Sequence, residues 1–241
     1  MKTCMSYRPK GPVWAVSGLR KRGMGNDMNV GSFDRIGLRR KPKQERSIQR
    51  LDLILSAASE LIAAKGVGAM RMTELAVAAN VPIGSVYQYF PEKAAIVKAL
   101  FDRHSLAIRA RVAEAFASVQ SVPEALDVLE ATIDWHYEDY RNDAASLGIW
   151  LGTETDQDLS QLNVEHNSRI ARIFRETAQR IAPELSNVDT EARTYLFSHL
   201  IGSSVRLAVT SDPFFAARIL QECKCLVRTS FFTPVPAALV A

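Results

Sequence analysis

From Ser47 onward, apolar residues recur at spacings of three and four, and this pattern constrains the fold more than any other feature of the chain. Such a period places apolar side chains on one face of an α-helix, whereas a half-buried strand would alternate at every second residue. No strand-like alternation longer than a few residues occurs. The sequence therefore predicts an all-α fold.

Start and stop signals divide this pattern into separate helices. Gly66 is expected to end the first helix, and the spacing of Ser121 and Glu124 is that of a capping box that opens a later one. Asp212 and Pro213 supply an N-cap and a first helical residue for the last helix. The expected helices span about 47–66, 73–79, 82–89, 93–116, 122–140, 159–182, 190–210 and 213–232.

Two short helices flank the turn Asn80-Val81-Pro82. Thr73 is expected to cap the first of them, because its hydroxyl can accept from an N–H of the first turn. Asn tolerates the left-handed conformation, and the residue before a proline is pushed out of the helical region. Small residues and two tyrosines are expected on the outward side of the second helix. This arrangement predicts a helix-turn-helix, the alternative being a corner that serves only packing.

Charge is distributed unevenly along the chain. Residues 1–46 hold 12 Lys or Arg against three acidic residues, a net charge of +9, while the remaining residues carry −5. This segment is rich in Gly and Pro without a sustained period, so it is expected to be a disordered basic arm. Two interpretations stay open: an arm that contacts a polyanion such as DNA, or a passive tail.

Several classes of protein are disfavoured. No apolar stretch approaches the roughly 20 residues of a membrane helix, and no signal peptide is recognisable, so a cytoplasmic protein is expected. Cys4, Cys223 and Cys225 form neither a disulfide framework nor a metal site. Phosphate-loop, dinucleotide-binding, metalloprotease and serine-hydrolase motifs are missing, so we expect no enzyme, no catalytic residue and no cofactor. A helical adaptor that binds only protein is the alternative to a DNA-binding protein.

The helix-turn-helix sequence from Thr73 to Lys93, with Val81-Pro82-Ile83-Gly84-Ser85-Val86-Tyr87 and Tyr89-Phe90-Pro91 inside it, resembles the signature of tetracycline-repressor-type (TetR-family) regulators. The resemblance covers about residues 47–107 and implies a three-helix DNA-binding domain in a homodimer. It also implies a ligand-binding bundle at 108–241, with the motif at about 70–89. The DNA contacts that it implies, mostly to phosphates, are Thr73, Ile83, Gly84, Ser85, Tyr87, Tyr89 and Lys93.

The C-terminal region resembles the family only in its helical layout. A small-molecule effector pocket is expected to be largely apolar with a few polar groups. The candidates for its lining are the aromatic residues and histidines between about 126 and 174, namely Trp135, His136, Tyr137, Tyr140, Trp150 and His166. We expect such an effector to release an operator in double-stranded DNA, and because repression is the commoner mode of action in the family, a repressor is the first expectation.

The segment Thr190–Thr210 is apolar on two sides. One stripe contains Leu196, Leu200 and Leu207, and another contains Phe197 and Ile201. A helix that is apolar on two faces needs two partners, so one face is expected to pack inside the subunit and the other to form a two-fold interface with the last helix. The residues assigned to that interface are Leu196, Leu200, Gly202, Ser203, Phe215 and Ile219.

Overall fold

The computed structural model describes residues 45–157, 159–183, 185 and 189–233. Within these residues the chain forms helices and no strand, as the sequence predicts. The predicted basic arm lies outside the described residues, except that Glu45 and Arg46 open the first helix. The helices are α1 (Glu45–Ala69), α2 (Met72–Ala78), α3 (Ile83–Tyr89), α4 (Lys93–Ala117), α5 (Val122–Asn142), α6 (Ala144–Thr155), α7 (Ser160–Ile181), α8 (Thr190–Val209) and α9 (Pro213–Ser230).

Most helix ends follow the expected signals. Gly66 interrupts α1 with φ of 77°, a conformation that glycine adopts without strain. The side chain of Ser121 accepts from the backbone N–H of Glu124 at the start of α5, and Asp212 accepts from two N–H groups at the start of α9. The expectation for Thr73 is wrong: α2 begins at Met72 with Arg71 at the N-cap, so Thr73 is an exposed residue of the first turn.

Helix α6 was not expected from the sequence. It is separated from α5 by Asp143 alone, whose carboxylate accepts from the N–H groups of Ala145 and Ser146. This cap lets a new helix start at once in a different direction.

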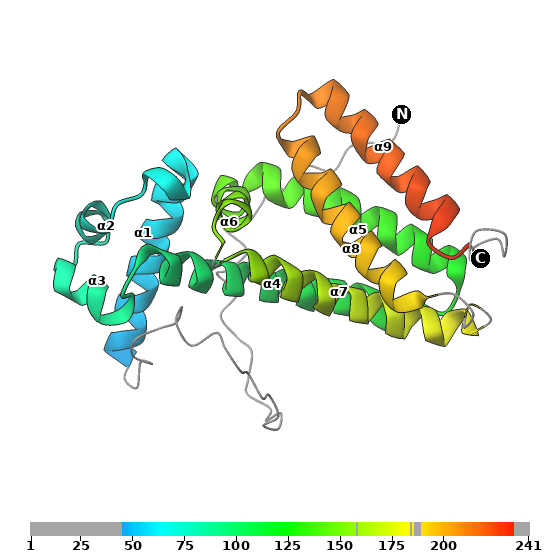
Figure 1. Ribbon diagram of the computed structural model, residues 1–241, viewed down its shortest axis with the longest axis horizontal. Helices are drawn as coiled ribbons and strands as arrows, with labels where there is room; N and C mark the ends of the chain where they lie inside the picture. Colours follow the sequence, from blue (N-terminus) through cyan, green and yellow to red (C-terminus); the bar gives the residue numbers. More distant parts are fainter. Residues whose placement is uncertain (1–44, 158, 184, 186–188, 234–241) are drawn as a thin grey trace, which may run out of the picture.

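The molecule has a head made of the first three helices and a body made of the last five, with α4 running from one into the other (Figure 1). Helix α6 packs along α1 and joins the two parts. The two helices can approach closely here because α6 has glycines at the contact. A Cβ atom added to Gly148 would lie 2.8 Å from Cγ2 of Ile62, and one added to Gly152 would lie 2.5 Å from Cγ2 of Val67. We call this contact the glycine seam.

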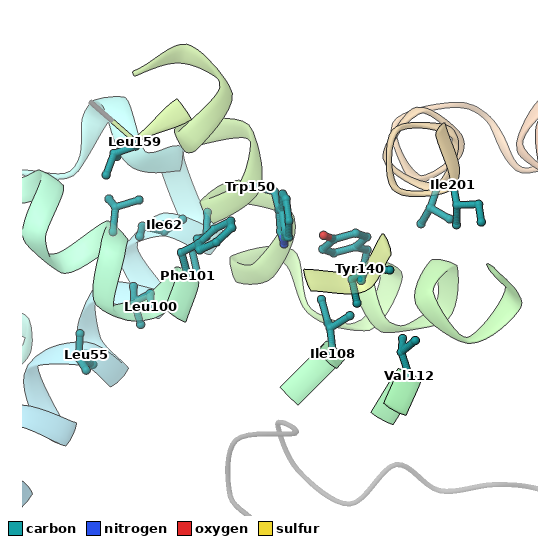
Figure 2. Close-up of a cluster of buried hydrophobic side chains, with 14 of the residues drawn as sticks. Leu55, Ile62, Leu100, Phe101, Ile108, Val112, Tyr140, Trp150, Leu159 and Ile201 are labelled. Atoms are coloured by element: carbon teal, nitrogen blue, oxygen red, sulfur yellow. The ribbon is translucent and has the colours of Figure 1, made fainter. Parts of the chain in front are cut away.

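A single apolar core runs through both parts of the described molecule. In Figure 2 the side chains of Leu55, Ile62 and Phe101 fill the side toward the head, and Trp150 and Tyr140 continue the core toward Ile201. The ring of Phe101 lies 4.7 Å from that of Trp150, centroid to centroid. The head and the body therefore share buried side chains across their junction.

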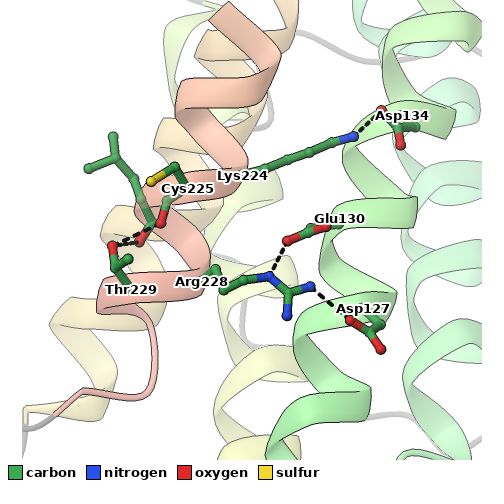
Figure 3. A network of polar contacts seen from close by, with 8 residues as sticks. Asp127, Glu130, Asp134, Lys224, Cys225, Arg228 and Thr229 are labelled. Carbon is green, nitrogen blue, oxygen red and sulfur yellow. Dashed lines mark hydrogen bonds and ion pairs between the residues drawn. The ribbon is translucent and has the colours of Figure 1, made fainter.

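Helix α9 is attached to α5 by charged side chains at the surface of the body (Figure 3). Lys224 donates to Asp134 at 2.6 Å, and Arg228 donates to Glu130 at 2.5 Å and to Asp127 at 2.8 Å. Cys223, on the same helix, is buried. No helix in the described part of the chain is long and apolar enough to cross a membrane.

Candidate nucleic-acid interface and ligand cavities

Helices α2 and α3, of seven residues each, form the helix-turn-helix. Asn80 has φ of 53°, the left-handed conformation expected of it, and Pro82 precedes the first residue of α3. Val86 and Phe90 are fully buried and fix α3 on the core. The turn and the inner face of α3 thus hold its other face at the surface of the head.

The outward face of α3 contains Ile83, Gly84, Tyr87 and Gln88, all exposed, with Ser85 half-buried beside them. Tyr89 does not belong to this face. It is only 5% exposed, so the expectation that both tyrosines point outward is wrong. The physical reason is the helical period, since Tyr89 follows buried Val86 by three residues. Gln88 was missed, although its position four residues after Gly84 was the signal for an outward side chain.

Lys93 begins α4, as expected. Its Nζ donates to the carbonyl oxygens of Val67 and Gly68, both at 3.0 Å. These carbonyls lie at the end of α1, where helical partners are lacking, so the ammonium group satisfies them and fastens α4 to α1. An ammonium group has three donors, so one can still meet a phosphate of DNA.

Four of the six predicted pocket residues line one of two cavities. A junction cavity of about 170 Å³ lies between α1, α4, α5 and α6 and has Trp135 in its wall. An inner cavity of about 30 Å³ lies deeper in the body and is lined by His136, Trp150 and His166. Tyr140 is buried between His104 and His136, with ring centroids at 5.8 and 4.7 Å. Tyr137 lines neither cavity and lies under the guanidinium group of Arg141.

The residues that line the two cavities include several buried polar ring atoms. Within the described residues, four buried ring nitrogens have no hydrogen-bond partner, namely His104 Nε2, His136 Nε2, Trp150 Nε1 and His166 Nδ1. Burial lowers the pKa of His104 to about 4 against the opposing charge of Asp143, and burial with the nearby His104 lowers that of His136 to about 3. Burial likewise places the pKa of His166 well below its usual value. All three imidazoles are therefore neutral at pH 7.

The junction cavity also holds a perturbed carboxyl group. Burial, together with the nearby carboxylate of Asp143, raises the pKa of Asp139 to about 6, although Arg111 opposes the shift. Perturbed carboxyl groups in a hollow mark candidate binding sites.

The two stripes of α8 have different environments. Phe197, Ile201 and Val205 are buried against the rest of the body, whereas Leu196 and Leu207 are 62% and 56% exposed. Of the residues assigned to an interface, Phe215 of α9 is also exposed, while Leu200, Gly202, Ser203 and Ile219 are half-buried. An apolar surface on α8 and α9 is thus left uncovered in the single chain.

Comparisons with known proteins agree with this architecture. Residues 54–100 match the family described as bacterial regulatory proteins, tetR family. Residues 123–235 match the tetracyclin repressor-like C-terminal domain. No curated protein matches the sequence.

Solved structures share the fold at low sequence identity. A TetR-family regulator from Syntrophomonas wolfei superposes with a TM-score of 0.63 at 14% identity, over 79% of this chain and 98% of that one. A TetR-family regulator from Pectobacterium atrosepticum gives 0.61 at 11% identity, over 80% and 100%. The fatty acid degradation regulator FadR from Bacillus halodurans gives 0.60 at 18% identity, over 79% and 98%.

The two matched regions together cover most of the chain and correspond to the head and the body of the fold. Proteins of this kind are DNA-binding transcription factors without enzymatic activity. The chain belongs to the tetR family of bacterial regulatory proteins and is a transcriptional regulator with a helix-turn-helix.

Proposed function

We propose that the protein is a cytoplasmic homodimeric repressor that binds a palindromic DNA operator. It dissociates from this operator when a small molecule binds among the helices of the body. The observation that carries the proposal is the outward face of α3. Ile83, Gly84, Tyr87 and Gln88 are exposed on a helix whose other face is locked into the core. Such a helix can enter the major groove with its side chains against base edges and phosphates.

The uncovered apolar surface of α8 and α9 supports the dimer. Leu196, Leu200, Ser203 and Leu207 lie along one side of α8 at helical spacing. Phe214 and Leu226 of α9 are 76% and 49% exposed. Large exposed apolar patches mark interaction sites, and a two-fold axis would bring the same surface of two copies together.

The operator can be identified by selecting the fragments of genomic DNA that the purified full-length protein binds. We expect an imperfect palindrome whose half-sites are separated by roughly 34–36 Å, one turn of DNA, because two recognition helices must reach successive major grooves. An adaptor that binds only protein would give no selection and no mobility shift.

Single substitutions then separate two kinds of contact. Tyr87→Ala should weaken binding to operator and to unrelated DNA alike, by about tenfold, since a hydroxyl–phosphate bond carries no sequence information. Gln88→Ala should reduce discrimination between bases, because a glutamine amide can bind adenine with both of its groups. Gln179→Ala, an exposed glutamine of α7, is the matched control. Unchanged DNA binding by the folded Tyr87→Ala, Gln88→Ala double variant would contradict the assignment.

A further inference from the structure

The junction cavity has the size and lining of a small-ligand site. Its volume of about 170 Å³ is comparable to the roughly 150 Å³ of a protein cavity that accepts benzene. Apolar walls come from Leu55 of α1, Leu100 and Ile108 of α4, and Ile149 of α6. Because α1 belongs to the head and α5 and α6 to the body, a ligand here would touch both parts of the molecule.

Two of the three carboxylates around the cavity are already engaged. Asp52 accepts from Arg103 at 2.5 Å. Asp143 accepts from two backbone N–H groups at the start of α6 and from the hydroxyl of Ser146 at 2.7 Å. No ion pair or side-chain hydrogen bond engages the half-buried carboxylate of Asp139 within the described part of the chain. Asp139 is therefore the carboxylate that can still accept hydrogen bonds from a ligand.

The tautomer of His104 follows from its hydrogen bond to Ser146. The single proton of the Ser146 hydroxyl is donated to Asp143, so the Ser146 oxygen, 3.0 Å from Nδ1 of His104, must accept from that nitrogen. A neutral imidazole with its proton on Nδ1 has an acceptor at Nε2, and this Nε2 is the buried atom without a partner. This Nε2 has no accessible surface, so the accessible unused acceptor of the cavity wall is the carboxylate of Asp139.

The aromatic wall already holds a positive charge. The guanidinium carbon of Arg111 lies 3.9 Å from the centroid of the Trp135 ring. A cation is attracted to the face of an indole, most strongly where water is excluded. Arg111 is exposed, and a ligand cation on this ring would have to displace its guanidinium group.

We infer that the junction cavity binds a small ammonium compound with one apolar group, its cation between Trp135 and Asp139 and its apolar group against Leu100 and Ile108. The inference rests on the proposed function, because it names the class of effector that would control the head. A donor-bearing cation pairs with the unused carboxylate of Asp139, whereas a carboxylate would face three acidic residues.

Binding should depend on pH in one direction. The charged or titratable groups that face the cavity come from α1, α4, α5 and the start of α6, and they are Asp52, Arg103, His104, Arg111, Asp139 and Asp143. With a pKa of about 6, Asp139 loses most of its charge between pH 7.5 and 5, whereas His104, with a pKa of about 4, stays mostly neutral. An amine with the ordinary pKa of a lysine stays protonated over this range. Its affinity should therefore fall as the pH drops through 6.

The test is calorimetric titration of the full-length protein with three compounds of similar shape. They are 2-phenylethylammonium, 2-phenylethanol and 3-phenylpropanoate. We expect the ammonium compound to bind at least about tenfold more tightly than the alcohol or the acid at pH 7.5, and to lose this advantage at pH 5. Equal or tighter binding of the alcohol or the acid, or no binding of the ammonium compound at millimolar concentration, would overturn the inference.

Variants locate the site. Asp139→Asn should weaken the ammonium compound by about tenfold or more, because a hydrogen bond to a charged group is replaced by one to a neutral amide. Glu138→Gln removes the neighbouring exposed carboxylate of α5 and should leave the affinity unchanged. Circular dichroism checks that both variants are folded. An Asp139→Asn protein that binds the ammonium compound like the wild type would place the cation elsewhere.

Operator binding separates this inference from the proposed function. The same titrations repeated with operator DNA should show weaker ammonium binding, by the factor by which the compound weakens DNA binding, because coupling between two sites is reciprocal. If the ammonium compound binds tightly and operator DNA does not change its affinity, the cation site is supported, but its control of DNA binding is refuted. If another compound releases the operator and the ammonium compound does not bind, the proposed control by a ligand is supported and the cation site is refuted.

Discussion

Asp139 shows how a single buried charge affects the stability of the fold. Its folded-state pKa of about 6 lies above the ordinary 3.8, so the folded protein binds this proton more tightly than the unfolded chain. The ionised carboxylate therefore costs stability above pH 6, and this cost disappears as the pH falls toward 3.8. Asp139→Asn should stabilise the protein by about 1 kcal/mol at pH 7.5, after allowance for the solvent that screens a half-buried group.

Urea unfolding of Asp139→Asn, Glu138→Gln and wild type at pH 7.5 and 5 measures this effect. The gain of Asp139→Asn should shrink at the lower pH, and Glu138→Gln should follow the wild type at both. A gain that is the same at pH 7.5 and 5 would show that the carboxylate of Asp139 is not held at a raised pKa.

At the scale of elements, the glycine seam makes the contact between head and body unusually sensitive. Gly152→Ala would bring its Cβ within 2.5 Å of Val67 Cγ2, and α1 and α6 would have to move apart. Overpacking of this kind costs typically about 1–3 kcal/mol, more than the roughly 1 kcal/mol that alanine gains in a helix. Thermal unfolding should therefore occur at a lower temperature.

Gly68→Ala is the control for this substitution, because a Cβ at Gly68 meets no atom within 4 Å. It should leave the melting temperature unchanged or slightly higher. If Gly152→Ala is as stable as Gly68→Ala, the two helices are not in the close contact described.

The elements that carry their own sequence signals were predictable, and those fixed by distant contacts were not. Asn80 and Pro82 located the helix-turn-helix, and Asp212 located the start of α9, because turns and caps are local. Helix α6 was missed since one residue separates it from α5 and its apolar run lacks a clear period. The wall of the junction cavity from α1 could not be foreseen either, because nothing near Leu55 indicates that the body packs against it.

For the whole molecule, the uncovered surface of α8 and α9 predicts the association state. Replacing both Leu196 and Leu207 by lysine places two charges on the exposed stripe of α8, where they would be buried without partners in a dimer. Sedimentation should show a dimer for the wild type and a monomer for the double variant at micromolar concentration. Leu106→Lys, a leucine of α4 that is 62% exposed, should remain dimeric. A monomeric wild type, or a dimeric double variant, would rule out this interface.

The length of α4, 25 residues, also allows a small movement at one of its ends to become a larger displacement at the other. A helix of this length is about 37 Å long, so a tilt of about 5° at its end in the body displaces the other end by roughly 3 Å. Lys93 ties that other end to α1 by two hydrogen bonds, and the head must travel with it. Two heads that each move by this amount in opposite directions change their separation by about 6 Å, nearly two base-pair steps of about 3.4 Å each. The strength of the two hydrogen bonds from Lys93 to α1 then limits how much of the tilt of α4 is transmitted to the recognition helix, rather than the size of the movement in the body.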